Sequence, residues 1–152
     1  MRSAIAYWDW AKAMLASRYG EGVALIFVRV ALAGVFWRSG RSKVVEGTWL
    51  TVSDTTHYLF ENDYSGVPLP PALAAQAATL AEFFFPVLLV LGLATRLSAL
   101  ALLGMTMVIQ ILVYPEAWWS VHILWVALAL VLVSRGGGLF ALDAPLALRL
   151  RR

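Results

Sequence analysis

A carboxylate and a proline lie close together inside one of the most apolar stretches of this chain. Glu82 and Pro86 both belong to the run TLAEFFFPVLLVLGLATR, residues 79–96. Proline has no backbone N–H, so it cannot donate the helical hydrogen bond to the carbonyl four residues earlier, which is that of Glu82. A helix here would therefore leave a free acceptor beside a carboxylate, able to hold a water molecule or a ligand donor.

Arg29 interrupts an earlier apolar run, GVALIFVRVALAGVFWRSG, residues 22–40. Ionisable side chains inside membrane spans cost several kcal/mol, so they usually face the protein interior and pair. At about 1.5 Å per residue, Arg29 would lie roughly 10 Å and Glu82 roughly 16 Å from the same end of their helices. We therefore predict a buried Arg29–Glu82 ion pair. It serves either to dock two helices or to relay protons through Glu82.

A second set of polar side chains is expected near the opposite end of the helices. Lys43, Gln110 and His122 would lie there among aromatic side chains. Donors beside a flat apolar slot suit a quinone head group, which has two carbonyls and a ring. The aromatic walls would come from Trp37, Tyr64, Tyr114 and Trp125. In the alternative interpretation, the aromatic residues anchor the protein at the membrane interface and His122 forms a hydrogen bond across helices.

Composition places all these residues in a membrane protein. The 152 residues are 61% hydrophobic and 14% charged, against about 45–50% and about 25% in soluble domains. A spanning helix needs roughly 17–25 residues, and four runs approach or reach that length. They cover residues 22–40, 72–94, 97–114 and 118–134. Since the last three are joined by very short connections, we predict an all-α, integral membrane four-helix bundle, with residues 1–152 as a single domain.

Two further segments accompany the spans. Residues 4–18 have helical propensity and many aromatic side chains, which indicates an interfacial amphipathic helix. Residues 41–71 are polar and contain WLTVSDTTHYLFENDYSG, where Ser53 or Asp54 would cap a surface helix. We expect this connection to be a structured lid, because its aromatic side chains need a surface to dock on.

The distribution of basic residues predicts the orientation in the membrane. Arg38, Arg41 and Lys43 are the basic residues expected on one side. Eight lie on the other: Arg2, Lys12, Arg18, Arg96, Arg135, Arg149, Arg151 and Arg152. The side with more Lys and Arg is usually cytoplasmic. We therefore predict both termini in the cytoplasm and the lid in the periplasm of a bacterial inner membrane. The orientation of the chain in the membrane accounts for its net charge of +3. We therefore expect no nucleic-acid partner.

Other kinds of chemistry have little support in the sequence. The chain has no cysteine, which excludes thiolate catalysis and Cys-ligated iron–sulfur clusters within it. His57 and His122 could in principle ligate one haem, but His57 has no place on a span. We expect neither a metal nor a haem. The stretch SRGGGLF follows no strand and is typical of a helix terminator rather than a phosphate loop.

Several segments together resemble the DoxX family of small bacterial membrane proteins. They include FWRSGRSKV, the block from YSGVPLPP to GMTMVIQ, VYPEAWWSVHILW and RGGGLFALD. The likeness covers most of residues 25–143. The residues that fit the pattern of the family are Trp37, Ser39, Gly40, Lys43, Glu82, Pro86, Gly92, Thr95, Arg96, Gln110, Tyr114, Pro115, His122 and Asp143. The one departure is Gly-Gly-Gly at 136–138, where the family often has Gly-Pro-Gly.

The resemblance implies a four-span protein of the bacterial inner membrane. Family members are associated with quinone-linked oxidoreductase systems, with oxidative-stress complexes or with modification operons. Our leading hypothesis is a quinone-interacting component that receives electrons from a periplasmic partner or donor. Lys43, Gln110 and His122 would hold the head group while Glu82 and Arg29 relay the proton. The alternative is a non-enzymatic scaffold or small-solute transporter subunit, with Arg29–Glu82 as a clamp. A protein partner or a homo-oligomer is expected, and whether the chain is itself an enzyme stays open.

Overall fold

Four helices of the computed structural model are long and apolar enough to cross a membrane. The structure describes residues 2–144, and within that range the four are α2 (Arg18–Lys43), α4 (Pro71–Leu91), α5 (Thr95–Leu112) and the segment Pro115–Arg135. The last begins as one 3₁₀ turn (Pro115–Ala117) and one π turn (Trp118–His122) and continues as α6 (Ile123–Arg135). The predicted all-α membrane bundle is confirmed.

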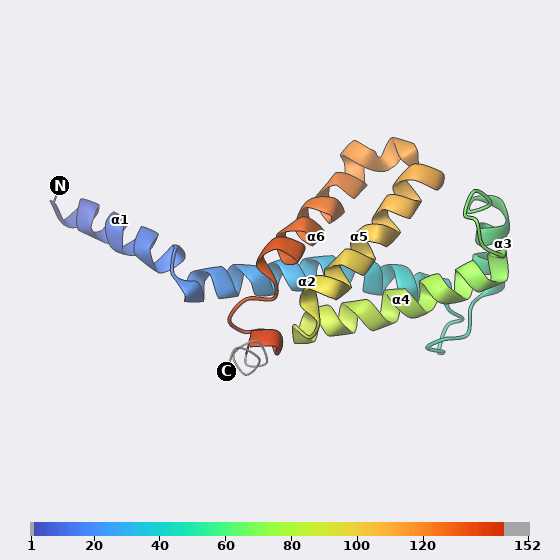
Figure 1. Cartoon of the computed structure of the whole chain (residues 1–152), viewed down its shortest axis with the longest axis horizontal. Helices are drawn as coiled ribbons and strands as arrows, with labels where there is room; N and C mark the ends of the chain where they lie inside the picture. Colours follow the sequence, from blue (N-terminus) through green and yellow to red (C-terminus); the bar gives the residue numbers. More distant parts are fainter. Residues whose placement is uncertain (1, 145–152) are drawn as a thin grey trace.

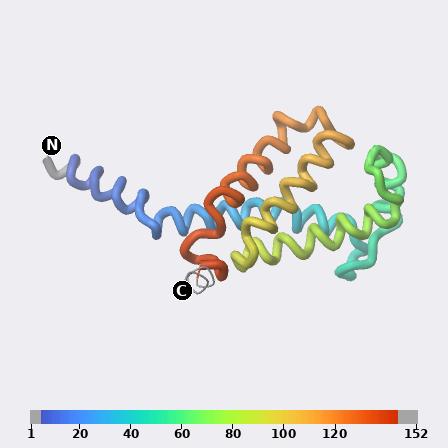
Figure 2. Tube along the Cα trace, in the orientation of Figure 1, coloured from blue at the N-terminus to red at the C-terminus, as the bar shows by residue number. Residues whose placement is uncertain are grey.

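The helices are arranged as two antiparallel pairs. Helices α2 and α4 lie along each other, and α5 with α6 forms a hairpin inclined against them (Figure 1). The hairpin meets the first pair near the end where α4 turns into α5 and diverges from it toward the other end (Figure 2). Helix α2 packs against α6 and α4 packs against α5, so each helix of the first pair contacts one helix of the second.

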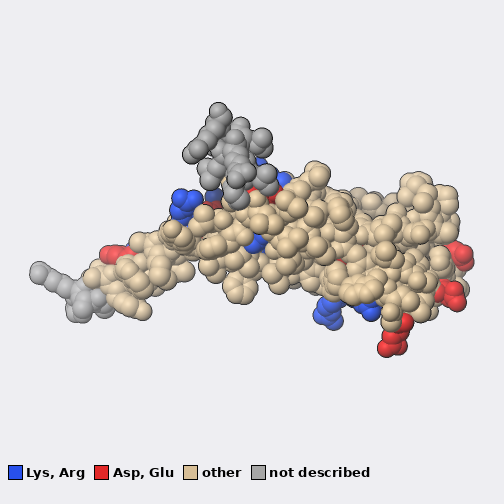
Figure 3. Space-filling view, turned by 90° about the horizontal axis from the view of Figure 1, so that it is seen from below, with Lys and Arg blue, Asp and Glu red and all other residues tan. Residues whose placement is uncertain are grey.

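The core lies between these pairs, and the outward faces of the helices are apolar as well. Buried residues of the core include Leu32, Phe36, Leu89, Leu102 and Leu132. Phe27, Phe84 and Leu124 are more than half exposed. Most charged side chains lie toward the two ends of the molecule, and the surface between them is mostly uncharged (Figure 3). Exposed apolar surface on this scale indicates a lipid-facing protein.

The boundaries of the helices differ from the predicted runs at several ends. Helix α2 begins at Arg18, where Ser17 caps it by accepting from the Gly20 amide, and it ends at Lys43 rather than at residue 40. The predicted third span, 97–114, is shifted to Thr95–Leu112. Helix α2 is longer because the polar end residues Arg18 and Lys43 stay helical, although they lower the apolar content of the run. Helix α5 ends early because the backbone leaves the helical region at Val113.

The segments predicted around the bundle are helical in part. Helix α1 (Arg2–Leu15) extends beyond the start of α2, away from the bundle (Figure 1); its place at a membrane interface stays a prediction. The connection after α2 contains α3 (Asp54–Asn62), and Ser53 rather than Asp54 caps it. Helix α3 packs on α4, as expected of a structured connection. Arg149, Arg151 and Arg152 of the predicted orientation lie outside the described residues.

After α6 the chain crosses the end of the bundle as a strap, residues 136–144. The Asp143 amide donates to the Gly92 carbonyl at 2.9 Å, just beyond the last turn of α4. The Asp143 carboxylate accepts from the Ala94 and Thr95 amides, at 2.8 Å each. These are the first amides of α5, which lack partners within the helix. The strap therefore fastens the α4–α5 turn to the end of α6.

We expect Asp143→Ala to destabilise the protein, because it leaves two amides at the start of α5 without an acceptor. The loss should be about 1–2 kcal/mol, as for other helix caps. Asp143→Asn keeps one acceptor oxygen and should lose less. Unfolding in detergent, followed by circular dichroism, measures both variants. Equal stability of Asp143→Ala and the unmodified protein would contradict this role of the strap.

Candidate functional site

Glu82 forms a buried ion pair with Lys43. The Lys43 Nζ lies 3.0 Å from Glu82 Oε1 and 2.8 Å from Oε2, and both side chains are almost fully enclosed. Lys43 also donates to Ser39 Oγ at 2.8 Å, and Ser39 Oγ donates to Glu82 Oε1 at 3.2 Å. The predicted Arg29–Glu82 pair is therefore wrong. The carboxylate is held by a lysine and a serine one helical turn apart on α2.

The error comes from the register of α2 against α4. The prediction counted both residues from ends assumed to lie at the same level. However, Glu82 packs at the level of Gly40, and Arg29 lies at the level of Gly92, where α4 ends. Helix α2 thus extends past the end of α4 by the eleven residues 18–28 that precede Arg29, or about 16 Å. Arg29 and Glu82 are correspondingly far apart along the bundle.

Gly40 is what lets α2 and α4 approach at Glu82. A methyl group on Gly40 would lie 3.2 Å from Glu82 Cβ and 3.3 Å from the Glu82 carbonyl oxygen. This is the carbonyl that Pro86 leaves without its helical donor. Helix α4 nevertheless runs without a break through Pro86, which is itself buried. The free carbonyl is therefore covered by the neighbouring helix at Gly40.

Arg29 is buried at the other end of the α2–α4 contact. Its Nε and Nη1 have no hydrogen-bond partner among the described residues, and Nη1 packs directly against Gly92. Asp143 in the strap is the carboxylate that acts on it electrostatically. The last carbonyls of α4 also favour a cation at this place. Arg29 thus belongs to the end of the bundle that the strap crosses, and the ion pair of Glu82 does not include it.

A cavity of about 280 Å³ opens beside the Lys43–Glu82 pair. Its wall on α4 consists of four alanines and Glu82, and its opposite wall comes from α5. Residues at the end of α3 and in the following loop close it. The lining residues are Lys43, Phe60, Tyr64, Val67, Leu69, Ala74, Ala77, Ala78, Ala81, Glu82, Met105, Val108 and Ile109. It is an apolar pocket with one charged pair in its wall.

Tyr64 gives this pocket a second polar group. Its ring stacks on Phe60, with the centroids 4.4 Å apart, and meets the edge of Tyr114 at 6.3 Å. Burial, with smaller effects from Tyr114 and Glu82, raises the pKa of Tyr64 to about 12. The hydroxyl therefore keeps its proton at physiological pH. It makes no hydrogen bond within residues 2–144, which leaves it free to donate to a ligand.

Gln110 and His122 form a separate pair that does not line the pocket. The Gln110 Nε2 donates to the Pro115 carbonyl at 2.8 Å, so its Oε1 faces His122 Nδ1 at 2.7 Å. Because that oxygen can only accept, Nδ1 carries the proton. His122 is buried, and its ring lies 5.1 Å from that of Trp125. This pair joins the end of α5 to the π turn before α6.

The structure divides the predicted quinone-site residues among three places. Lys43 lies in the pocket wall, whereas Gln110 pairs with His122 and Trp125 packs against His122 near the α5–α6 connection. Trp37 packs against Trp49 and Phe83. Tyr114 donates to Asp63 at 3.1 Å and borders the pocket through Tyr64. The alanine wall was not predicted, although the spacing of Ala74, Ala77, Ala78 and Ala81 places these residues on one face of α4.

Comparison with known proteins identifies a family but no characterised relative. A family model described as DoxX matches residues 24–115. An uncharacterized protein of Haemophilus influenzae (strain ATCC 51907 / DSM 11121 / KW20 / Rd) is 29% identical over 140 residues, covering 82% of this chain and 83% of that protein. No solved structure matches the chain. The matched range contains Arg29, Lys43, Glu82 and Gln110 and ends before His122.

We expect Gly40→Leu to destabilise the bundle, because the side chain would push α2 away from α4 at Glu82. Overpacking of this kind costs about 1–3 kcal/mol. Gly34→Leu is the matched control on the same helix, since a methyl group on Gly34 meets nothing within 4 Å. Thermal unfolding in detergent compares the two variants. Similar losses in both would show that Gly40 is not a point of close contact.

We expect Lys43→Met to cost about 3–5 kcal/mol, because it leaves the Glu82 carboxylate buried without its partner. The double variant Lys43→Met/Glu82→Leu removes both charges and should recover most of that loss. Unfolding by sodium dodecyl sulfate in mixed micelles measures both free energies. A double variant as unstable as the single one would show that the pair does more than balance two charges.

Proposed function

The chain belongs to the DoxX family of membrane proteins, and we propose that it is a quinone-interacting component of a membrane oxidoreductase system. The pocket beside Lys43 and Glu82 would hold the head group. The observation that carries this proposal is a buried ion pair in the wall of an otherwise apolar pocket. A pocket of this kind suits a small apolar ring with a few polar atoms.

The shape of the pocket fits a flat ring. Four alanines give the α4 wall of the pocket a flat surface without long side chains. Met105, Val108 and Ile109 face this wall from α5. A volume of about 280 Å³ leaves room for a head group but for little of an isoprenoid tail. The tail would leave between α4 and α5, where Ala77 and Val108 are exposed, into the surrounding lipid.

The polar groups fit the two carbonyls of a quinone unequally. Tyr64 has a protonated hydroxyl that is free to donate to one of them. Lys43 already has three acceptors within 3.0 Å, two on Glu82 and one on Ser39. The Lys43 ammonium could donate to a ligand only by giving up one of these three hydrogen bonds. The bond to Ser39 is the one to an uncharged acceptor. Glu82 would exchange a proton with the ligand as its charge balance with Lys43 changes.

A quinone bound here would take up two electrons and two protons to become a quinol. In our proposal the electrons come from a periplasmic partner or a small periplasmic donor, as the chain has no cysteine and no metal-ligand cluster among the described residues. The pocket lies at the end of the bundle away from α1 and the strap. We propose that this end faces the periplasm of a bacterial inner membrane, with both termini in the cytoplasm.

The second candidate is a scaffold or small-solute transporter subunit. The closed hydrogen-bond triangle of Ser39, Lys43 and Glu82 favours it, because each charged group is satisfied without a ligand. In that case the pair fixes the register of α2 against α4, and the pocket is a gap beside it. Quinone binding distinguishes the two functions, since only the first requires it.

We expect purified protein in nanodiscs to bind a short-chain ubiquinone or menaquinone analogue. Ala77→Phe should weaken binding at least about tenfold, because the ring fills the pocket. Leu80→Phe is the control one turn away: Leu80 is exposed and does not line the pocket. Tyr64→Phe removes one hydrogen-bond donor and should weaken binding about three- to tenfold. Isothermal titration calorimetry measures each dissociation constant.

The same titration separates the pocket from the Gln110–His122 pair. His122→Ala should bind the analogue as the unmodified protein does, because His122 does not line the pocket. Weaker binding in His122→Ala together with unchanged binding in Ala77→Phe would move the site to the α5–α6 connection. Absence of binding in the unmodified protein would favour the scaffold or transporter.

A further inference from the structure

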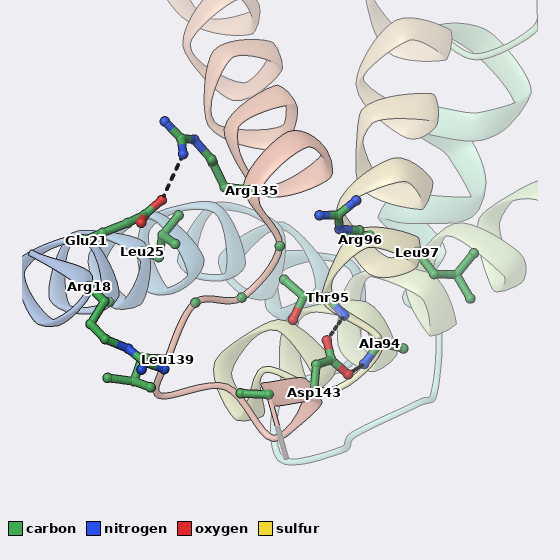
Figure 4. Close-up of a pocket in the computed structure, with 15 residues that line it drawn as sticks. Arg18, Glu21, Leu25, Ala94, Thr95, Arg96, Leu97, Arg135, Leu139 and Asp143 are labelled. Atoms are coloured by element: carbon green, nitrogen blue, oxygen red, sulfur yellow. Dashed lines mark hydrogen bonds and ion pairs between the residues drawn. The ribbon is translucent and has the colours of Figure 1, made fainter. Parts of the chain in front are cut away.

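A larger cavity, of about 860 Å³, lies at the opposite end of the bundle, beneath the strap. Its walls come from the start of α2, the start of α5, the end of α6 and residues 136–144 (Figure 4). No residue of this cavity takes part in the pocket at Lys43 and Glu82. It is lined by Arg18, Glu21, Gly22, Leu25, Ala94, Thr95, Arg96, Leu97, Arg135, Gly136, Gly137, Gly138, Leu139, Asp143 and Ala144.

Three arginines from three different helices line the cavity: Arg18 of α2, Arg96 of α5 and Arg135 of α6 (Figure 4). The structure uses only a small part of their donor capacity. Arg96 donates through Nη2 to the Ser134 carbonyl at 3.1 Å, and Arg18 makes no hydrogen bond within the described part of the chain. Each guanidinium has five N–H donors in a planar fork that matches phosphate oxygens.

The two carboxylates of the cavity do not neutralise these arginines. Both oxygens of Asp143 accept backbone amides at the start of α5. Glu21 Oε1 lies 3.2 Å from Arg135 Nη1 in a solvent-exposed ion pair, and such pairs contribute little to stability. Arg18 and Arg96 are left without an acidic partner among the described residues, so three arginines line the cavity with two carboxylates that are already engaged. The cavity therefore attracts an anion.

A buried donor in the wall is also unpaired. The Thr95 side chain is completely enclosed, and its Oγ1 has no hydrogen-bond partner among the described residues. Leaving a buried hydroxyl unpaired costs about 1–3 kcal/mol. Thr95 follows Ala94 at the start of α5, next to Arg96 and opposite Gly137, where a side chain would overlap with it. The glycine leaves space for the strap to pass close to this hydroxyl.

The remaining wall is apolar and continues onto the lipid-facing surface. Leu25 is buried and Leu139 half-buried, whereas Leu97 is 64% exposed on the outer face of α5. The cavity lies where α5 begins and α6 ends, which is the level of the lipid head groups for helices of this length. A ligand here would have its anionic part among the arginines and an apolar part along Leu97.

We propose that this cavity binds the phosphate group of an anionic phospholipid. The chemistry it recognises is a phosphate oxyanion, for which the arginine forks and the Thr95 hydroxyl are donors. The apolar wall at Leu97, which is exposed on α5, selects a phosphate that carries acyl chains over a free phosphate ion. Basic cavities between transmembrane helices are known to bind anionic head groups in this way.

Native mass spectrometry of the purified protein in detergent tests the proposal, with phosphatidylglycerol and phosphatidylcholine as the two probes. We expect tighter binding of phosphatidylglycerol. Arg18→Gln and Arg96→Gln should each weaken it about fivefold, with no effect on phosphatidylcholine. Arg38→Gln is the control, since Arg38 is an exposed arginine near the other end of α2. Equal binding of the two lipids, or equal losses in all three variants, would overturn the proposal.

Thr95→Val provides a test that does not alter charge. Since it removes an unpaired buried hydroxyl and keeps the shape, it should leave thermal stability in lipid-free detergent unchanged or higher. It should nevertheless weaken phosphatidylglycerol binding about threefold, as the loss of one hydrogen bond does. Unchanged lipid binding would remove Thr95 from the site. Inorganic phosphate that binds alone and displaces the lipid at equal concentration would show that the site takes a free anion, contrary to our assignment.

Discussion

The close contact of α2 with α4 at Gly40 and Glu82 is the constraint on which the rest of the structure depends. A glycine on one helix and the backbone of the other meet within van der Waals distance there. Only at that separation can Lys43 reach both oxygens of Glu82 and share the serine one turn earlier. The charged pair tolerates burial because each of its polar atoms has a partner, and the partners are available only in this register.

The same register determines what lies at the two ends of the bundle. With Glu82 opposite Gly40, the end of α4 falls beside Arg29, and the first turns of α2 project past the α4–α5 connection. The strap fills the angle between them, which creates the arginine-lined cavity. At the opposite end, the α5–α6 hairpin diverges from α4, and the apolar pocket lies in the wedge. One packing contact thus places two cavities of opposite character at opposite ends.

Much of the fold could be predicted from the sequence, because each span is a long run of mostly apolar residues. On α2, five residues that recur at helical spacing are all buried, namely Arg29, Ala33, Phe36, Gly40 and Lys43. The partner of Glu82 could not be predicted, since it depends on how far one helix is shifted along another. The length of an apolar run does not predict how far the helix is shifted along its neighbour. Gly40, however, marked the contact, as a glycine between charged residues of a span leaves room for a neighbouring backbone.

The unequal lengths of the spans have a consequence for the surrounding bilayer. Helix α2 has 26 residues and α5 has 18, or about 39 Å and about 27 Å. A hydrocarbon layer of about 30 Å is thinner than the first helix and slightly thicker than the second. The lipid next to α5 is therefore compressed, while α2 tilts or extends its charged ends into the head groups. Membrane thickness thus acts on the angle between the two helix pairs, and through it on the width of the wedge.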